Sequence, residues 1–282
     1  MKIIQTENLD VDLVAGGHVA MFVTDKEMET AQVDYAAAKA AGIYLDDVEW
    51  LSKEVMELVS CVTRFDLLAV NLSLQTYGIS HPGSRFPAHN LWPLKLVTEL
   101  YKLAQKKTSR FSLALHTRTP VTAVSSIPND SRRWLLSTPR GDIRCTYVIH
   151  ATNGYASYLL PHLQGTPGIV PTRGQAIALQ ADATLSELTQ ASWASNERHE
   201  YWFPRPVKVS EDGKEENPIV ILGGGRQEAG LNFERNETDD STLHRDVGKY
   251  LREYLPERFP GKYEKGREPT MEWVTRAIKP GI

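Results

Sequence analysis

The sequence predicts a mixed α/β and α+β fold whose two domains are interleaved along the chain. Residues 147–149 form a short apolar run, and the small and polar residues 150–154 follow it directly, which is typical of a buried strand ending near a ligand. Residues 93–107 carry apolar side chains at helical spacing, and residues 169–179 are typical of a long strand. Open α/β sheets bind ligands at the carboxyl ends of their strands, so we expect residues 151–154 to face a ligand.

The first part of the chain predicts strands and helices in alternation. Glycines at 16 and 17 favour a hairpin turn, Thr24 or Asp25 can cap the first long helix, and Ser52 can cap the next. The expected elements are a hairpin over 9–14 and 18–24, helices over 25–41 and 52–60, a strand over 65–74 and a turn-rich loop over 77–90.

The middle of the chain predicts the later half of a dinucleotide-binding domain. A proline at position 93 is tolerated at the start of a helix, and the apolar stripe behind it is typical of a core face. The expected elements are a helix over 93–107, a strand over 111–115, an extended segment over 121–127, a hairpin over 134–138 and 143–147, the buried strand over 147–149 and a helical turn over 155–160.

The last part of the chain predicts a second sheet region with one packing helix. The charged segment 210–217 is typical of a solvated connection between two paired strands. The expected elements are a strand over 169–179, paired strands over 201–206 and 218–222, a helix over 242–255 that Pro256 ends, and a strand over 268–273.

Composition describes a globular chain and argues against several classes of partner. The 282 residues are 41% hydrophobic and 24% charged with a net charge of -3, so we expect a sizeable core and neither nucleic acid nor a membrane as partner. Cys61 and Cys145 lack metal-ligand spacing and predict reduced thiols, and no metal site is expected. The absence of a signal peptide or an apolar span predicts a cytoplasmic protein. The oligomeric state stays open.

Several segments together resemble a known family. In chain order they are GISHPG and WPLKLV, HTRTPV, VIHATNGYAS with LLPHLQG, IVPTRGQ, and ILGGGR. This set resembles the D-amino-acid oxidase (DAO) superfamily of FAD-dependent oxidoreductases, most closely its fungal-type members, and covers nearly the whole chain to about Trp273.

The resemblance implies a partial, Rossmann-like FAD-binding domain interleaved with a mixed or antiparallel-sheet substrate domain. The expected boundaries are 1–77 and 168–273 for the substrate domain, 78–167 for the partial FAD-binding domain, and 274–282 for a divergent tail. Carried over position by position, the resemblance implies FAD contacts from Val121, Ala151, Thr152, Asn153 and Gly154. For Val121, a plain strand residue remains an equal alternative.

The resemblance also implies a reaction. Its members oxidise a carbon–nitrogen bond of a small amine or amino acid by hydride transfer to the flavin. Such a site needs a cation for a substrate carboxylate and an aromatic wall near the flavin. Arg226 is the expected cation and Tyr201 the expected wall, whereas Arg173 on a strand favours a structural ion pair.

Two departures from the family pattern bear on activity. The sequence has no GxGxxG turn, and after Trp273 the expected flavin-contacting segment is replaced by VTRAIKPGI. We therefore expect either a truncated, inactive chain or a mispredicted gene model. We also expect exposed apolar faces and a tendency to aggregate. The alternatives are a non-catalytic binding or interaction module and a nicotinamide-dependent dehydrogenase. The missing GxGxxG turn weakens the dehydrogenase hypothesis as much as it weakens the flavoenzyme hypothesis.

Overall fold

The computed structural model describes residues 1–58, 79–106, 111–165, 168–185, 187–195, 199–207 and 216–280. The strand expected over 65–74 and Cys61 lie outside these described residues. In the described part of the chain, the helices are too short or too polar to cross a membrane.

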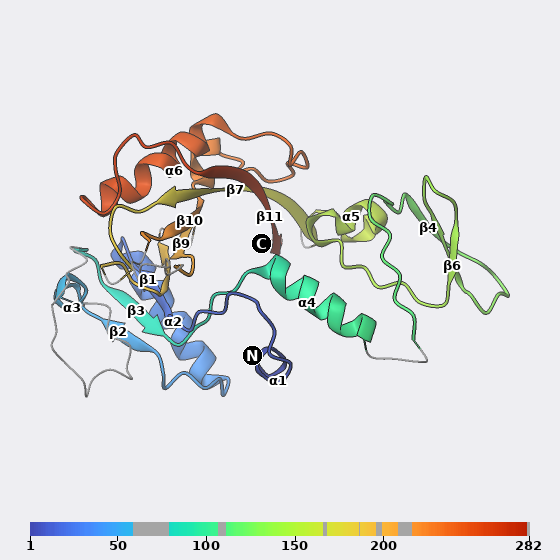
Figure 1. The fold of residues 1–282 in the computed structure, drawn as a ribbon, viewed down its shortest axis with the longest axis horizontal. Coiled ribbons are helices and arrows are strands. Elements are labelled where there is room, and N and C mark those ends of the chain that lie inside the picture. The colour runs from blue at the N-terminus through green and yellow to red at the C-terminus, as the bar shows by residue number, and fades with distance from the viewer. Residues whose placement is uncertain are drawn as a thin grey trace. The chain divides into compact units, whose positions relative to one another are not determined.

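Helices and strands alternate along the described chain as far as α4, and two runs of consecutive strands, β4 to β6 and β7 to β10, follow (Figure 1). The strands are β1 His18–Met21, β2 Glu49–Leu51, β3 Gly83–Phe86, β4 Ala123–Ser126, β5 Trp134–Ser137, β6 Ile143–Cys145, β7 Ile169–Gln180, β8 Ser192–Ser195, β9 Glu200–Pro204, β10 Ile219–Gly224 and β11 Met271–Pro280. The α-helices are α1 Lys2–Thr6, α2 Asp25–Ala40, α3 Lys53–Leu58, α4 Pro93–Lys106, α5 Ala156–Leu159 and α6 Arg245–Arg258, and the 3₁₀ turns are η1 Asn153–Tyr155, η2 Pro161–Leu163 and η3 Arg226–Ala229.

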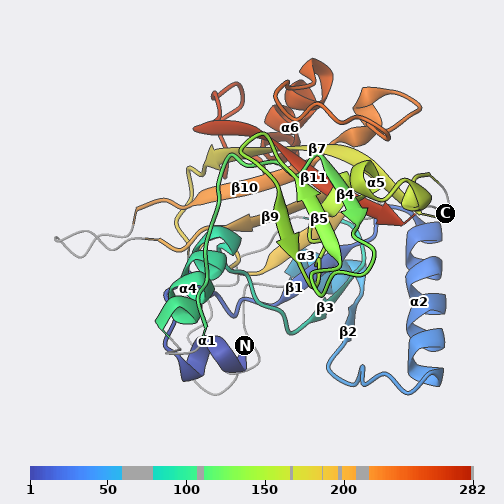
Figure 2. The same ribbon diagram turned by 90° about the vertical axis from the view of Figure 1, so that its right-hand side faces the viewer.

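The described strands form two sheets. An eight-stranded mixed sheet has the order β11-β7-β10-β9-β8-β1-β3-β2, in which β1 and β8 run parallel while β7, β10, β9 and β8 pair antiparallel in turn. A three-stranded antiparallel sheet has the order β4-β5-β6, and its first two strands lie side by side in Figure 2. The predicted mixed α/β and α+β fold class is confirmed.

The chain divides into two compact units, each built from separated segments. The first unit comprises residues 1–100, 175–231 and 243–274, and the second comprises residues 101–174, 232–242 and 275–282. Residues 78–100, which the sequence assigned to the cofactor domain, cluster with the first unit. The first unit contains β1 to β3, β8 to β10 and α6, and the second contains β4 to β6.

The hydrophobic core of the first unit lies between its sheet and α6 (Figure 1). Leu222 of β10 and Leu251 of α6 are completely buried. Trp193 and Trp202 stack on adjacent strands with their ring centroids 5.6 Å apart. This packing fixes α6 against the face of the sheet that carries Trp202.

The helices expected over 25–41 and 93–107 form, and both begin at the predicted residue. The side chain of Thr24 accepts a hydrogen bond from the Glu27 backbone, and Glu27 Oε2 accepts one from the Thr24 backbone, so a capping box starts α2. α4 begins at Pro93, the first-turn position that tolerates proline. Both helices are therefore determined by local signals.

The predicted hairpin over 9–14 and 18–24 is wrong. β1 pairs with β3 and β8, whereas Val14 forms only an isolated bridge to Asn90. Gly17 at the expected turn accepts a hydrogen bond from the Ser192 backbone nitrogen, so the chain leaves the turn toward a distant strand. The loop predicted over 77–90 likewise contains β3, because it supplies the partner for β1.

The predicted strands over 111–115 and 147–149 are also wrong. Both segments lack strand assignment, and Phe111, Leu115, Tyr147 and Ile149 are 56%, 63%, 77% and 90% exposed. Among the described residues of the second unit, β4 to β6 pair only with one another. No parallel neighbour in the described part of this unit therefore buries these apolar runs.

Two predicted boundaries near the end of the chain also shift. α6 begins at Arg245 and continues through Pro256 to Arg258, although a proline inside a helix removes one backbone hydrogen bond. β11 begins at Met271 and runs to Pro280, and it neighbours β7 in the sheet. The segment expected as a divergent tail thus contributes to a strand.

Candidate functional site

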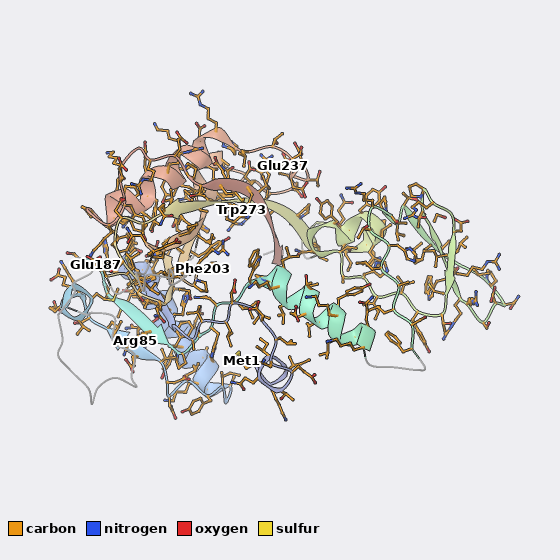
Figure 3. The ribbon with its side chains drawn as sticks, in the orientation of Figure 1. Met1, Arg85, Glu187, Phe203, Glu237 and Trp273 are labelled. Carbon is orange, nitrogen blue, oxygen red and sulfur yellow. The ribbon has the colours of Figure 1, made fainter. Side chains whose placement is uncertain are left out.

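The strand β9 separates two chemically different faces. Glu200, Trp202 and Pro204 are buried, whereas Tyr201 is 38% exposed and Phe203, labelled in Figure 3, is half-buried. Because successive side chains of a strand point to opposite faces, Tyr201 and Phe203 share the face away from α6. The expected aromatic wall therefore lies on the more accessible side of the sheet.

Tyr201 lies in a row of very small residues across the sheet. It is opposite Gly223 on β10 and Ala194 on β8, and Gly223 is in turn opposite Ala176 on β7. A Cβ atom added to Gly223 would lie 2.7 Å from Cε1 of the Tyr201 ring and nearer still to its phenol end. Glycine at 223 is therefore required for the tyrosine ring to lie flat across β10.

A glycine turn carries the expected cation at the end of β10. Gly224 and Gly225 have φ values of 132° and 68°, and Arg226 then begins η3. A Cβ atom on Gly225 would lie 2.9 Å from the Tyr250 ring of α6. The glycines thus provide the backbone conformation and the close approach that bring partly exposed Arg226 to the same end of the sheet as Tyr201.

On the opposite face, a polar row connects the sheet to α6. The row consists of Ser195 on β8, its register partner Glu200 on β9, and Gln175 on β7. The Ser195 hydroxyl shares a hydrogen bond with the Tyr254 hydroxyl, and Gln175 Oε1 accepts one of 2.8 Å from the His244 backbone nitrogen at the start of α6. Each described member of the row therefore contributes to the placement of α6.

Glu200 is the central member of this row and is completely buried. Its Oε1 accepts hydrogen bonds from Gln227 Nε2 at 2.5 Å and from the Tyr250 hydroxyl at 3.0 Å. One carboxylate oxygen thereby joins β9, η3 and α6. Burial, and next the negative charge of Glu200, raise the pKa of Tyr250, so this phenol stays a donor at neutral pH.

Tyr254 behaves in the same way one helical turn later. Burial is the main cause that raises its pKa to about 12, the Ser195 hydrogen bond acts in the opposite direction, and the charge of Glu200 adds to the rise. Both tyrosines therefore supply neutral hydroxyls to the polar row. The row is a structural feature of the α6 interface that can hold the glycine turn in place.

Arg173 forms the structural ion pair that its place on a strand predicted. Its guanidinium binds Glu234, with both side chains about one-tenth exposed, and also donates to the carbonyl oxygen and hydroxyl of Thr242. The hydrogen bond to Glu234 is the main cause that raises the pKa of Arg173. Arg173 thus fixes the segment 232–242 to β7 within the second unit.

The five expected cofactor contacts all lie in the second unit. Val121 precedes β4 and is half-buried. Ala151 and Thr152 are exposed, while Asn153, with φ of 49°, starts η1 and Gly154 is buried. The tetrad is thus a loop and a 3₁₀ turn with accessible side chains, and its contact with FAD stays a prediction.

The residues of this chain fit only part of an FAD site. A dinucleotide pyrophosphate is held by a GxGxxG turn at the N-terminus of a helix, and no such spacing occurs in the 282 residues. The described loop over 151–154 leads only into η1 and the four-residue α5. These residues can line a ligand, but they do not supply the pyrophosphate grip.

A metal centre has no support among the described residues, which contain no group of three His, Cys, Asp or Glu side chains able to hold an ion.

Sequence reasoning missed Glu200, Gln227 and Tyr250. For Glu200, the alternation of side chains along β9 was a signal in the sequence. Glu200 is two residues from the large apolar Trp202, so both side chains lie on the same, buried face.

Comparisons with known proteins agree with this architecture. Residues 1–281 match the family DAO, described as FAD dependent oxidoreductase. The chain is similar to glycine oxidase from Geobacillus kaustophilus, with TM-score 0.64, 15% identity and coverage of 99% of this chain and 63% of that one. It is similar to L-proline dehydrogenase from P. horikoshii, with TM-score 0.62, 15% identity and coverage of 98% and 63%.

A third solved structure, L-alpha-glycerophosphate oxidase from Mycoplasma pneumoniae with FAD bound, has TM-score 0.59, 16% identity and coverage of 97% of this chain and 64% of that one. The chain thus spans less than two thirds of the length of each of these structures. A search of curated proteins found no match. The cofactor of the matched family is FAD, as the resemblance implied. Because the family match extends over residues 1–281, the chain belongs to the DAO family of FAD-dependent oxidoreductases.

Proposed function

We propose that the first unit is the substrate-binding sheet of an oxidoreductase that oxidises a carbon–nitrogen bond of a small amine or amino acid. The observation that supports this best is the pairing of Tyr201 with Gly223, directly before the glycine turn that carries Arg226. An aromatic ring and a cation at one end of a sheet of small residues suit a short substrate with a carboxylate.

Arg226 is the residue proposed to bind the substrate carboxylate. A guanidinium can donate two parallel hydrogen bonds to a carboxylate, which fixes both the position and the orientation of the substrate. Its place at the start of η3 restricts the backbone from which this side chain extends. Substrates without a carboxylate should therefore depend less on Arg226.

Tyr201 is proposed to form one wall of the substrate site. Its ring covers Gly223 and is partly exposed, so it can pack against an apolar part of a substrate while its hydroxyl remains near water. FAD supplies the hydride acceptor of this reaction class, and contacts from Val121 and Ala151 to Gly154 remain part of the proposal. The reaction of the whole protein is likewise a proposal.

Activity measurements on the purified full chain with added FAD test this function. Amino acids and matched amines that lack the carboxylate would be supplied in parallel, with dye reduction and peroxide formation as readouts. R226A should raise KM about 10- to 100-fold for amino acids, because a charge-assisted hydrogen bond contributes roughly 1.5–3 kcal/mol, and should change KM little for the amines. R226K should be intermediate, since lysine lacks the planar fork.

R245A is the matched control, because Arg245 is an exposed arginine of the same unit at the start of α6. It should leave both substrate groups unaffected. Equal loss for amino acids and amines in R226A would contradict carboxylate binding. A wild-type chain that neither retains flavin nor oxidises any amine or amino acid would contradict the proposed reaction.

A further inference from the structure

We propose that Glu200 is a positioning residue that holds the glycine turn carrying Arg226 in its place on the sheet. The proposal rests on the substrate role given to Arg226 and extends it to a buried group that would not touch substrate. It follows from the contacts of Glu200, Gln227 and Tyr250 within the first unit.

The burial of Glu200 makes its donors indispensable. A completely buried carboxylate is costly unless hydrogen bonds replace the water it has lost. Gln227 Nε2 and the Tyr250 hydroxyl both donate to Oε1, at 2.5 Å and 3.0 Å. These donors come from η3 and α6, so keeping both hydrogen bonds to Oε1 requires both elements to keep their positions against β9.

The orientation of the Gln227 side chain is set by this contact. The amide nitrogen of Gln227 faces Glu200 and donates to Oε1, so the amide oxygen points away from this contact. The amide oxygen of Gln227 is buried and has no hydrogen-bond partner among the described residues. Within the described part of the chain, Glu200 is therefore the polar group that holds the Gln227 side chain.

The backbone of the turn needs such an external contact. Gly224 and Gly225 have positive φ, and glycine has more freedom to leave a given conformation than any other residue. The turn itself contributes a 3.0 Å bond from the Glu228 nitrogen to the Gly225 oxygen. Gln227 directly follows Arg226, so fixing its side chain restricts where the guanidinium can extend.

Glu200 and Tyr201 are consecutive residues of β9, so their side chains lie on opposite faces of the strand. Glu200 points toward α6, while Tyr201 points to the opposite face and covers Gly223. Two consecutive residues of β9 therefore position both parts of the proposed site. Tyr201 forms the aromatic wall, and Glu200 holds the turn that carries Arg226. Loss of the Glu200 contact should loosen Arg226 without moving Tyr201.

Hydrogen exchange on the full chain provides the direct test. In Q227L, a peptide covering residues 225–229 should exchange about 10-fold faster or more, because a hydrogen bond to a charged group is removed. Q180L is the matched control, since Gln180 Nε2 donates to the carbonyl oxygen of Asn217 at 2.6 Å in the same unit, at the other end of β7 from the glycine turn. It should leave this peptide unchanged. No acceleration in Q227L, or equal acceleration in both variants, would overturn the proposal.

An exchanged pair separates positioning from simple loss of fold. E200Q/Q227E keeps one amide and one carboxylate in contact with their places reversed, so the slow exchange of residues 225–229 should return. Q227E alone places two carboxylates together and should exchange faster than wild type. If the exchanged pair behaves like Q227E alone, the specific hydrogen bond is not what holds the turn.

Ligand binding distinguishes this proposal from the function on which it rests. Glycine and methylamine, which differ in the carboxylate, would be titrated into the full chain. Q227L should weaken glycine binding about 10-fold, the usual scale of one lost charge-assisted contact, and leave methylamine binding unchanged. Unchanged glycine binding despite faster exchange would overturn the link to Arg226. Wild-type protein that binds no glycine, with the exchange result intact, would refute the proposed substrate and support the positioning role.

Discussion

Replacing Gly223 by alanine tests whether the Tyr201 ring lies across β10. The added Cβ atom would be 2.7 Å from Cε1 of the ring, against about 3.5–4.0 Å for favourable carbon contacts. The backbone itself accepts alanine, because Gly223 does not have a positive φ. The cost of G223A should therefore come from displacing one aromatic side chain.

The loss of stability in G223A depends on how far the Tyr201 side chain can move away from the added methyl group. Overpacking of a well-packed site costs about 1–3 kcal/mol. Tyr201 is 38% exposed, so its ring can turn outward, and we expect the lower end, about 1 kcal/mol. In the Y201A background the collision is absent, and alanine should stabilise by about 0.4–1 kcal/mol because it restricts the unfolded chain.

Denaturant unfolding of wild type, G223A, Y201A and the double variant measures this coupling. The two substitutions should be non-additive by about 1–2 kcal/mol, with the double variant more stable than the sum predicts. G261A is the control, because Gly261 has φ of 81° and open space around its Cβ position. It should lose about 1–2 kcal/mol through backbone strain and add to Y201A within about 0.5 kcal/mol. Additivity of G223A with Y201A would refute the proposed ring position.

Three further substitutions test other parts of the structure. T24A should destabilise the chain by about 1 kcal/mol in denaturant unfolding through loss of the α2 cap, and T24S should not. Hydrogen bonds from the Ser241 hydroxyl, the Ser241 backbone and the Thr242 hydroxyl lower the pKa of Asp239 from 3.8 to about 2, so the contribution of Asp239 to stability is complete above pH 3.8 and is lost as the pH falls toward 2. Thermal melting at a series of pH values should show this loss in wild type and a flatter profile in D239N; equal profiles would contradict it. L251A should cost about 2–5 kcal/mol because Leu251 of α6 is completely buried in the core of the first unit, whereas L243A, at a side chain that is 48% exposed, should change stability by less than about 0.5 kcal/mol.

The candidate site shows how far a family resemblance can lead. The motif ILGGGR suggested Arg226, and the strand YWFP suggested Tyr201, and the structure places both residues at the paired ends of β9 and β10. Their chemical roles remain predictions. Glu200 was missed because a charged residue at the start of a strand is usually solvated. Its alternation with Trp202 indicated the buried face, and the register with Ser195 and the hydrogen bond from Tyr250 of α6 show that burial in the structure.

The exposed apolar segments of the second unit illustrate a different limit. The run at Tyr147 to Ile149 has the composition of a buried strand, yet it lies open as coil in the structure. A strand requires a neighbour for its backbone hydrogen bonds, and the described strands of this unit are paired with one another. The composition of this segment therefore indicated a preference for strand structure, but it did not predict whether a neighbouring strand would be present.

The sequence by itself determined the features that arise within a few residues or between consecutive strands. Capping at Thr24, the proline at the start of α4, the hairpin of β5 and β6, and the β9–β10 pair all follow from local periodicity and turn chemistry. The tertiary structure decided the pairing of β1 with β3 and β8 and the polar row beneath α6. These features join segments tens of residues apart or more, and their free energy comes from burial and register that exist only once the distant partners meet.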